Sequence, residues 1–256
     1  MMYILPLLKR VLFWASLFVF TTASNAALST DLHVAVATNF ILPAKQIAQE
    51  FEAETGNSIQ LSFASSGKLF AQIHHNAPYD IFLSADLIKP QRLIEAQKAE
   101  KTSLAVYAKG KLVVWSRSPF TATDLKTAIS NAQHIAIANP RFAPYGVAAE
   151  ESLRSLSLWE GSKEKLVKGE SVGQAFQFAY SQNADIGLIA LSQALSRPQL
   201  GYYLEVPTRL HKEIHQAGVV LSTTEKPVLA HQFMAFLMRA DIQAKIAQFG
   251  YEHTIH

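Results

Sequence analysis

Short apolar runs alternate with amphipathic segments along almost the whole chain, and this alternation restricts the possible folds more than any other feature of the sequence. Residues 31–39 (DLHVAVATN) contain the continuous apolar run 34–37, which is typical of a strand buried on both faces. Residues 41–56 follow with apolar side chains at helical spacing up to Gly56. This strand–helix alternation predicts an α/β fold in which helices flank both faces of a mainly parallel sheet.

The same alternation continues to the C-terminus without an internal repeat or a low-complexity linker. Further strands are predicted at 58–64, 80–85, 111–116, 134–139, 185–190, 201–207 and 214–222. Further helices are predicted at 67–75, 87–97, 124–130, 146–157, 172–181, 226–240 and 241–250. A chain of this length without a flexible linker indicates two lobes joined by crossing strands. We expect lobe 1 at 27–109 plus 218–256 and lobe 2 at 110–217.

The first 26 residues have the layout of a secretory signal peptide. Two basic residues precede an apolar stretch at 11–20, and the small residues Ser24 and Ala26 occupy the −3 and −1 places of a cleavage site. The apolar stretch is shorter than the about 20 residues of a membrane-spanning helix, which disfavours the alternative of a single membrane anchor. We therefore expect cleavage near Ala26 and export of the remaining chain to the periplasm.

The charge and the cysteine content disfavour two further classes of protein. The chain carries 23 Lys and Arg against 20 Asp and Glu, a formal net charge of +3, and two of the basic residues lie in the expected signal peptide. Because no basic block occurs, nucleic acid is not an expected partner. Cysteine is absent, so an exported chain of this kind depends on a hydrophobic core and not on disulfides.

Four predicted strand-to-helix junctions combine glycine with small or polar residues. The first N–H groups of a helix have no acceptor within the helix, and the helix dipole adds about half a positive elementary charge at the same end. Each junction alone is also an ordinary helix cap or tight turn. In open α/β sheets, however, such helix starts gather at the carboxyl edge of the strands and can together bind an anion. The junctions are Thr38-Asn39, Ser65-Ser66-Gly67, Pro144-Tyr145-Gly146 and Ser171-Val172-Gly173.

These junctions lack the groups that catalysis or metal binding needs. No base is paired with Ser66, and the loop at Lys68 has neither the glycine spacing of a phosphate-binding P-loop nor a Ser or Thr after the lysine. The segment HKEIH at 211–215 lacks the glutamate at the second position of a zinc-protease motif. We therefore expect a binding protein and not an enzyme, without a cofactor or a metal site, that holds its ligand through neutral donors.

A series of motifs covers nearly all of residues 27–256: VAVATNF, FASSGKL, APYDIFLSAD, IANPRFAPYG with GVAAEESL, ESVGQAF and ADIGLIA. In these motifs and in their order, the sequence resembles the periplasmic molybdate-binding proteins of ABC transporters. The resemblance implies a periplasmic binding protein of the type II fold, in which two lobes close on molybdate or tungstate. It also implies a membrane permease as the partner, and we expect the protein to be a monomer.

The resemblance assigns five ligand-binding residues. The polar position of the first loop falls on Asn39, with Thr38 beside it, and the second serine of the SS pair is Ser66. Tyr145 and Val172 stand at positions that bind the ligand through main-chain N–H groups in the family. The resemblance therefore implies donors from all four junctions.

One position departs from the family pattern. Ala190 stands where some members place a tyrosine hydroxyl, and Thr38 is expected to replace that donor. The departure leaves another oxyanion or a small carboxylate open as the ligand. An exported enzyme acting on phosphate esters and a sensory protein that signals to a membrane receptor are further alternatives.

Overall fold

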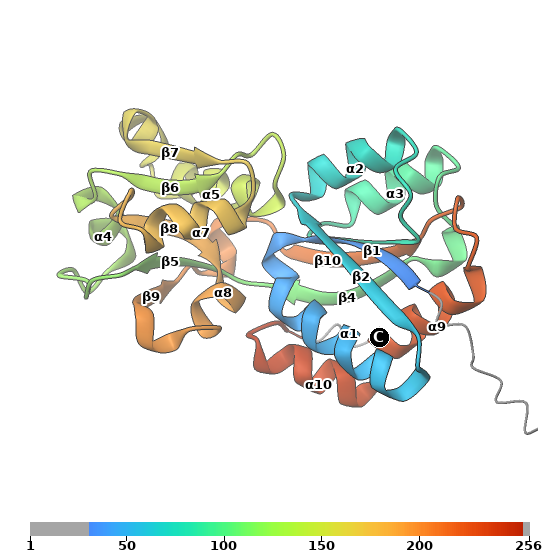
Figure 1. The fold of residues 1–256 in the computed structure, drawn as a ribbon. Coiled ribbons are helices and arrows are strands. Elements are labelled where there is room, and N and C mark those ends of the chain that lie inside the picture. Colours follow the sequence, from blue (N-terminus) through green and yellow to red (C-terminus); the bar gives the residue numbers. More distant parts are fainter. Residues whose placement is uncertain (1–30, 253–256) are drawn as a thin grey trace, which may run out of the picture.

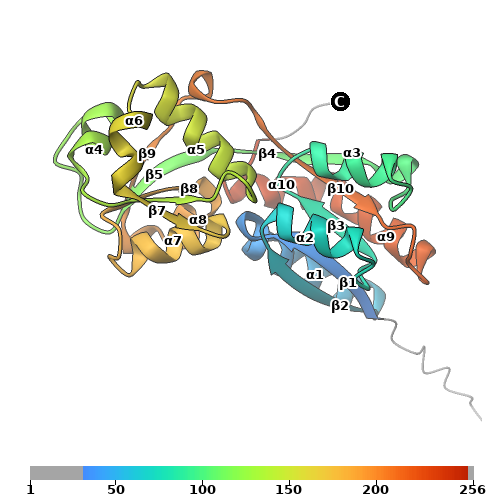
Figure 2. The ribbon, with the colours of Figure 1, turned by 90° about the horizontal axis from the view of Figure 1, so that it is seen from above.

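The computed structural model describes residues 31–252, so the expected signal peptide at 1–26 lies outside the described residues. Within the described range, every helix falls short of the length and apolar character that a membrane crossing requires. The described residues fold into two lobes, each built on a five-stranded sheet (Figures 1 and 2). This is the two-lobed α/β architecture that the sequence predicts.

The sheet of the first lobe has the strand order β2-β1-β3-β10-β4. Its first three strands are parallel, whereas β10 runs antiparallel to both of its neighbours. The register pairs Ala37 at the end of β1 with Ala64 at the end of β2, so the loops after both strands leave from the same edge. The strands are β1 (Asp31–Ala37), β2 (Ser58–Ala64), β3 (Ile81–Ser84), β4 (Ala105–Gly110) and β10 (Ile214–Val220).

Helices cover both faces of this sheet, with α2 and α3 on one face and α1, α9 and α10 on the other (Figure 1). On the latter face, Phe51 packs edge-on against Phe233 and Phe236, with 5.2 Å between the ring centroids of each pair. α1 ends at Gly56, whose φ of 72° is a left-handed conformation that favours glycine. The helices are α1 (Ile41–Thr55), α2 (Ser66–His74), α3 (Ile88–Glu95), α9 (Pro227–Leu237) and α10 (Ala240–Gln248).

The sheet of the second lobe has the strand order β7-β6-β8-β5-β9, in which β6 is parallel to β7 and β8 and the other pairs are antiparallel. Here the register pairs Ala138 at the end of β6 with Gly169 at the end of β7. The strands are β5 (Leu112–Ser116), β6 (Ile135–Ala138), β7 (Leu166–Gly169), β8 (Ile186–Ala190) and β9 (Tyr202–Glu205). The helices are α4 (Leu125–Asn131), α5 (Pro144–Ser155), α6 (Trp159–Ser162), α7 (Val172–Tyr180) and α8 (Leu191–Leu195).

The apolar pattern does not predict two strands, β4 and β7, which lie at the edge of a sheet. The segment 105–110 has an apolar run of only four residues, 105–108, before lysine and glycine, and 165–168 has a lysine at each end. Each strand pairs with one other strand, β10 and β6 respectively. Edge strands tolerate lysine, and in these two the lysine shortens the apolar run, whereas the edge strands β2 and β9 were predicted.

The chain crosses between the lobes twice. Lys111 joins β4 to β5, and residues 206–213 return from β9 to β10. All seven residues of β10 belong to the strand that pairs with β3 and β4, so the expected boundary between 217 and 218 falls inside it. The limits of the lobes stay a prediction, and we propose to place the second limit within 206–213.

Candidate functional site

The five residues that the sequence singles out surround one small cavity between the lobes. Its volume is about 10 Å³. The first lobe contributes three of the five residues and the second lobe two. The residues that line the cavity are Thr38, Asn39, Ser66, Tyr145 and Val172, together with Ala37, Ser65, Ala85, Ala143 and Pro144. The fold thus brings all four junctions together, whereas the role of the individual residues as ligands stays a prediction.

Parallel strand pairs explain why these junctions meet. Because β1 and β2 end in register, Thr38 and Ser65 leave the first sheet side by side. In the second lobe β6 and β7 also end in register, and α5 and α7 follow them toward the first lobe. Carboxyl ends of strands from both sheets therefore face the same cavity, as is typical of binding crevices in α/β proteins.

Three helices start at the cavity. Ser66 and Val172 are the first residues of α2 and α7, and Tyr145 is the second residue of α5. Their main-chain N–H groups have no acceptor within the helix, and each helix dipole adds partial positive charge. The ten residues that line the cavity carry no charged side chain. An anion in the cavity would therefore meet neutral groups alone.

The two adjacent serines divide two tasks between them. Ser65 is the N-cap of α2, and its Oγ accepts a hydrogen bond from the Lys68 N–H (3.4 Å). Ser66 is only 1% exposed, and its Oγ accepts from the Ala85 N–H (2.9 Å). The second bond fixes the Ser66 side chain and leaves its hydroxyl hydrogen free to donate.

The amide of Asn39 is held within the protein. Its Nδ2 donates to Gln216 Oε1 (2.7 Å) and to the Tyr251 hydroxyl (3.0 Å). Its Oδ1 is buried and has no hydrogen-bond partner among the described residues. Both side-chain donors of Asn39 are thus engaged, which leaves the main-chain N–H as the donor that this residue can offer to a ligand.

Thr38 makes a direct contact between the lobes. Its Oγ1 accepts a hydrogen bond from the Gly173 N–H at the start of α7 (3.2 Å). A hydroxyl that accepts one bond still has its own hydrogen to donate. The Thr38 hydroxyl can therefore bind the second lobe and donate to a ligand at the same time. A free donor at Thr38 is what the expected replacement of the tyrosine hydroxyl missing at Ala190 requires.

Ala190 lies near the site but not in it. The residue ends β8 and is fully buried, and it is absent from the lining of the cavity. Its N–H donates to Gln193 Oε1 (3.1 Å), and Gln193 Nε2 donates to the Val172 carbonyl (3.2 Å). Gln193 thus ties the end of β8 to the start of α7, a supporting contact that the sequence does not reveal.

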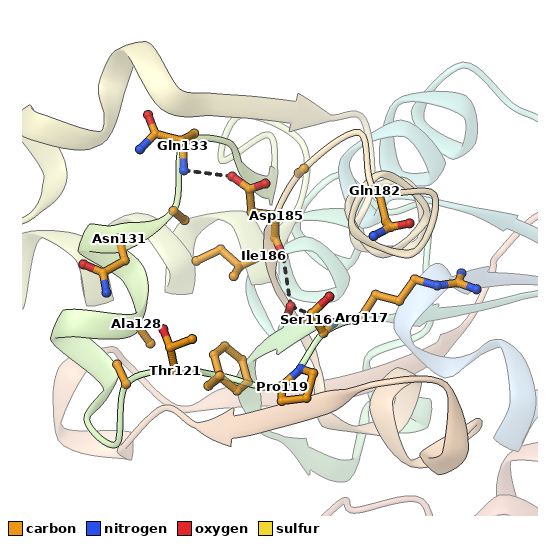
Figure 3. A pocket seen from close by; sticks show the side chains of 15 residues that line it. Ser116, Arg117, Pro119, Thr121, Ala128, Asn131, Gln133, Gln182, Asp185 and Ile186 are labelled. Carbon is orange, nitrogen blue, oxygen red and sulfur yellow. Dashed lines mark hydrogen bonds between the residues drawn. The ribbon is translucent and has the colours of Figure 1, made fainter.

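A larger cavity of about 350 Å³ lies within the second lobe, at the end of β5 (Figure 3). Some of its polar groups bind one another. The Asp185 carboxylate accepts from the N–H groups of Gln133 and His134 (both 2.8 Å), and Ser116 Oγ donates to the Asp185 carbonyl (3.1 Å). This cavity contains none of the predicted residues. Within residues 31–252, no group of three or more His, Asp or Glu side chains is arranged to hold a metal ion.

Comparison with known proteins decides the family. The pattern of the family described as "Bacterial extracellular solute-binding protein" matches residues 32–252. The chain belongs to this family. The solute-binding protein is similar to the molybdate-binding protein ModA of Rhodobacter capsulatus, with 37% identity over 226 residues that cover 88% of this chain and 89% of the relative.

A second relative is known both by sequence and by structure. The molybdate-binding protein ModA of Azotobacter vinelandii is 38% identical over 230 residues, covering 88% of this chain and 91% of the relative. The solved structure of the periplasmic molybdate-binding protein of Azotobacter vinelandii superposes with a TM-score of 0.83 at 35% identity, covering 88% of this chain and 100% of that chain. These relatives are binding proteins, and they share the two-lobed architecture with the solute-binding protein.

The lobes of the solute-binding protein also meet beside the cavity, at a contact that we call the mouth and define by Gly67, Lys68, Phe142 and Glu170. The Gly67 N–H donates to the Phe142 carbonyl (2.8 Å). Lys68 and Glu170 form an ion pair. Lys68 therefore has a partner in the opposite lobe, and it is not among the residues that line the cavity.

Replacing Lys68 by alanine should weaken ligand binding by at most about fivefold, because ion pairs between exposed side chains contribute only about 0–1 kcal/mol. The Lys68 and Glu170 side chains are 42% and 64% exposed. Titration of the Lys68→Ala protein with the ligand tests this expectation, with Glu170→Ala as the matched partner variant. Loss of binding in Lys68→Ala alone would show that the anion needs a counter-charge.

Two alanines line the cavity wall at positions that the sequence does not single out. Ala85 and Ala143 line the cavity, and Ala85 also donates its N–H to Ser66. Alanine carries no chemical signal of its own, so only its place in the fold identifies it. The junction motifs Ser65-Ser66 and Pro144-Tyr145 lie next to these alanines in space and were the signal available.

Proposed function

We propose that this protein is the periplasmic binding component of an ABC transporter, which captures molybdate between its lobes and delivers it to a membrane permease. The observation that carries the proposal is the convergence of four strand-to-helix junctions, from both lobes, on one cavity without a charged lining side chain. Similarity to molybdate-binding proteins over nearly the whole described chain supports the choice of ligand.

A cavity lined mainly by hydrogen-bond donors suits molybdate better than phosphate. Molybdate is fully deprotonated at neutral pH and offers four acceptor oxygens, whereas phosphate always carries at least one O–H at this pH. The free donors of the lining residues are the Ser66 and Thr38 hydroxyls and the main-chain N–H groups at the helix starts, and Asn39 Oδ1 is a buried acceptor without a partner. Unless its O–H reached Asn39 Oδ1, a protonated phosphate would bury a donor that lacks an acceptor, which costs about 1–3 kcal/mol.

Size should separate molybdate from sulfate. Hydrogen bonds to a charged group contribute roughly 1.5–3 kcal/mol each, so several of them together give tight binding after the costs of desolvation and closure. Sulfate has the same charge but is smaller, and a cavity shaped for the larger anion leaves some of its donors unpaired. Tungstate has nearly the size of molybdate, and we propose that it binds as well.

Binding requires that the lobes separate and close again. The cavity of about 10 Å³ has room for about one water molecule, and both lobes contribute to its wall. An anion can therefore enter only when the contacts at the mouth and between Thr38 and Gly173 open. We propose that the closed, ligand-bound monomer is the form that the permease recognises in the periplasm.

Calorimetric titration of the ligand-free protein, residues 27–256, with four anions tests the proposed function. We expect tight one-to-one binding of molybdate and tungstate and no measurable heat with sulfate or phosphate at the same concentrations. Equal affinity for sulfate would contradict the size argument, and binding of phosphate would contradict the argument from hydrogen-bond donors. The absence of measurable binding heat with all four anions would refute molybdate capture.

A further inference from the structure

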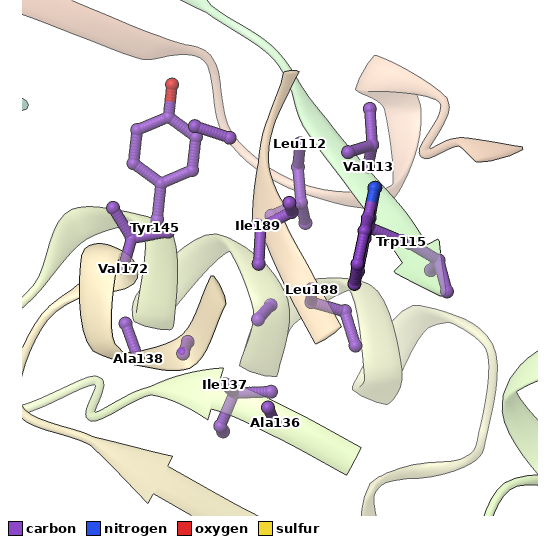
Figure 4. Packing of buried hydrophobic residues seen from close by; sticks show 14 of the residues in the cluster. Leu112, Val113, Trp115, Ala136, Ile137, Ala138, Tyr145, Val172, Leu188 and Ile189 are labelled. Atoms are coloured by element: carbon purple, nitrogen blue, oxygen red, sulfur yellow. The ribbon is translucent and has the colours of Figure 1, made fainter. Parts of the chain in front are cut away.

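The side chain of Tyr145 starts in one lobe and ends against the other. Tyr145 is the second residue of α5, yet its side chain belongs to the same apolar cluster as Ala37, Ala85 and Ile214 of the first lobe. Its residue exposure is 1%. Figure 4 shows the ring directed away from Ala138 and the rest of β6, with the hydroxyl at its far end. The ring is therefore a contact between the lobes.

The hydroxyl of Tyr145 occupies space that Gly110 leaves free. A Cβ atom on Gly110 would lie 2.1 Å from the Tyr145 hydroxyl oxygen and 3.0 Å from its Cζ. Gly110 is the last residue of β4, directly before the crossing residue Lys111. Its backbone is not in the left-handed region, so the conformation does not require glycine here. The absence of a side chain is explained by the room that Tyr145 needs.

The Tyr145 hydroxyl lies against Gly110, which is not among the residues that line the cavity, although Tyr145 itself is. The hydroxyl oxygen is buried without a hydrogen-bond partner among the described residues. Burial also raises the pKa of Tyr145 well above its ordinary value, so the group remains a neutral hydroxyl. Its contribution is therefore one of shape, on the side of the cavity where the chain crosses between the lobes.

We propose that Tyr145 is a positioning residue. Its ring fills the space left by the missing side chain of Gly110, which we call the notch, and thereby fixes the start of α5 against the first lobe. The ring and the main-chain N–H that faces the cavity belong to the same residue. A ring held in the notch consequently holds that N–H at one distance from Ser66 and Thr38 on the opposite wall. The inference deepens the proposed function and rests on it.

A double-mutant cycle on molybdate affinity tests the contact. Gly110→Ala should weaken binding by at least about tenfold, because the new Cβ overlaps the hydroxyl when the lobes close. Tyr145→Phe keeps the main-chain N–H and should weaken binding by about two- to fivefold, since the notch is then partly empty. In the double variant the phenylalanine removes the overlap of 2.1 Å and leaves the tighter-than-usual contacts of 3.0 Å to Cζ and to Gln216 Nε2, so the affinity should recover to within about fivefold of the wild-type value.

Two readouts separate positioning from a general loss of stability. The coupling between the two substitutions should appear in the dissociation constant for molybdate and not in the melting temperature of the ligand-free protein. Gly161→Ala is the matched control, because a Cβ at Gly161 meets no atom within 4 Å, and its affinity should equal that of the wild type. If the increase in the dissociation constant of the double variant equals the product of the increases in the two single variants, the inference is overturned. If the wild type binds molybdate but the two substitutions show no coupling, the contact between Tyr145 and Gly110 is refuted and the proposed function remains intact.

Tyr145→Leu tests the same contact without a change at Gly110, and so covers the case in which Gly110→Ala does not fold. Leucine keeps the main-chain N–H but does not reach the notch. We expect about tenfold weaker molybdate binding, because the start of α5 is no longer held against the first lobe. An affinity equal to that of the wild type would overturn the inference.

Discussion

Ser66→Ala should weaken molybdate binding by about 10- to 150-fold, the equivalent of the roughly 1.5–3 kcal/mol that one hydrogen bond to a charged group contributes. The Ser66 hydroxyl is buried at the start of α2, and its oxygen already accepts from the Ala85 N–H, so its hydrogen is directed by the protein. Alanine removes this donor and leaves one oxygen of a buried dianion unpaired. Calorimetric titration with molybdate measures the loss, and an unchanged dissociation constant would remove Ser66 from the site.

The same substitution also leaves the Ala85 N–H without its acceptor, which is expected to lower the melting temperature. Asp124→Ala separates this effect from the loss of a ligand contact. Asp124 caps α4 through the Thr127 N–H (2.9 Å) and does not line the cavity. Its replacement should destabilise the protein by about 0.5–2 kcal/mol and leave the affinity for molybdate unchanged.

Gly67→Ala should prevent the lobes from closing fully and weaken molybdate binding by about 5- to 150-fold. A Cβ at position 67 would lie 2.7 Å from the Phe142 carbonyl oxygen and 3.0 Å from its Cα. Both are main-chain atoms that cannot rotate away, and an overlap of this kind costs about 1–3 kcal/mol. Because this cost arises only in the closed state, it is subtracted from the free energy of ligand binding.

The first lobe itself should tolerate this substitution. Gly67 lies within α2, where alanine is the better helix former by about 1 kcal/mol. The ligand-free variant should therefore melt at the wild-type temperature or above it. Small-angle scattering at saturating molybdate should give a radius of gyration between the ligand-free and the closed values of the wild type. Full compaction together with wild-type affinity would show that the contact between Gly67 and Phe142 is not needed for closure.

Local patterns predicted most of the fold. The strand at 31–37, the helix that ends before Gly56 and the buried strand at 135–138 are visible in the sequence because apolar spacing and a helix stop are properties of neighbouring residues. The edge strands β4 and β7 were missed, since a lysine in each of them shortens the apolar run.

The sequence by itself determined the four junctions and their chemistry. Thr38, Ser66, Tyr145 and Val172 could be named because a helix start exposes N–H groups wherever it occurs, and because the motifs resemble those of a known family. The neutrality of the site followed from the same residues. The sequence therefore determined the junctions of each lobe separately, because each junction is a local feature of the chain.

Only the tertiary structure decided how these features act together. The Asn39 amide is engaged by Gln216 and Tyr251, far along the chain, so its side chain has no spare donor for a ligand. Gly110 is required by the ring of Tyr145 from the other lobe. Such contacts join residues from distant parts of the sequence, and their distances depend on the packing of both sheets. No local pattern encodes them, because they exist only once the two lobes are folded and face each other.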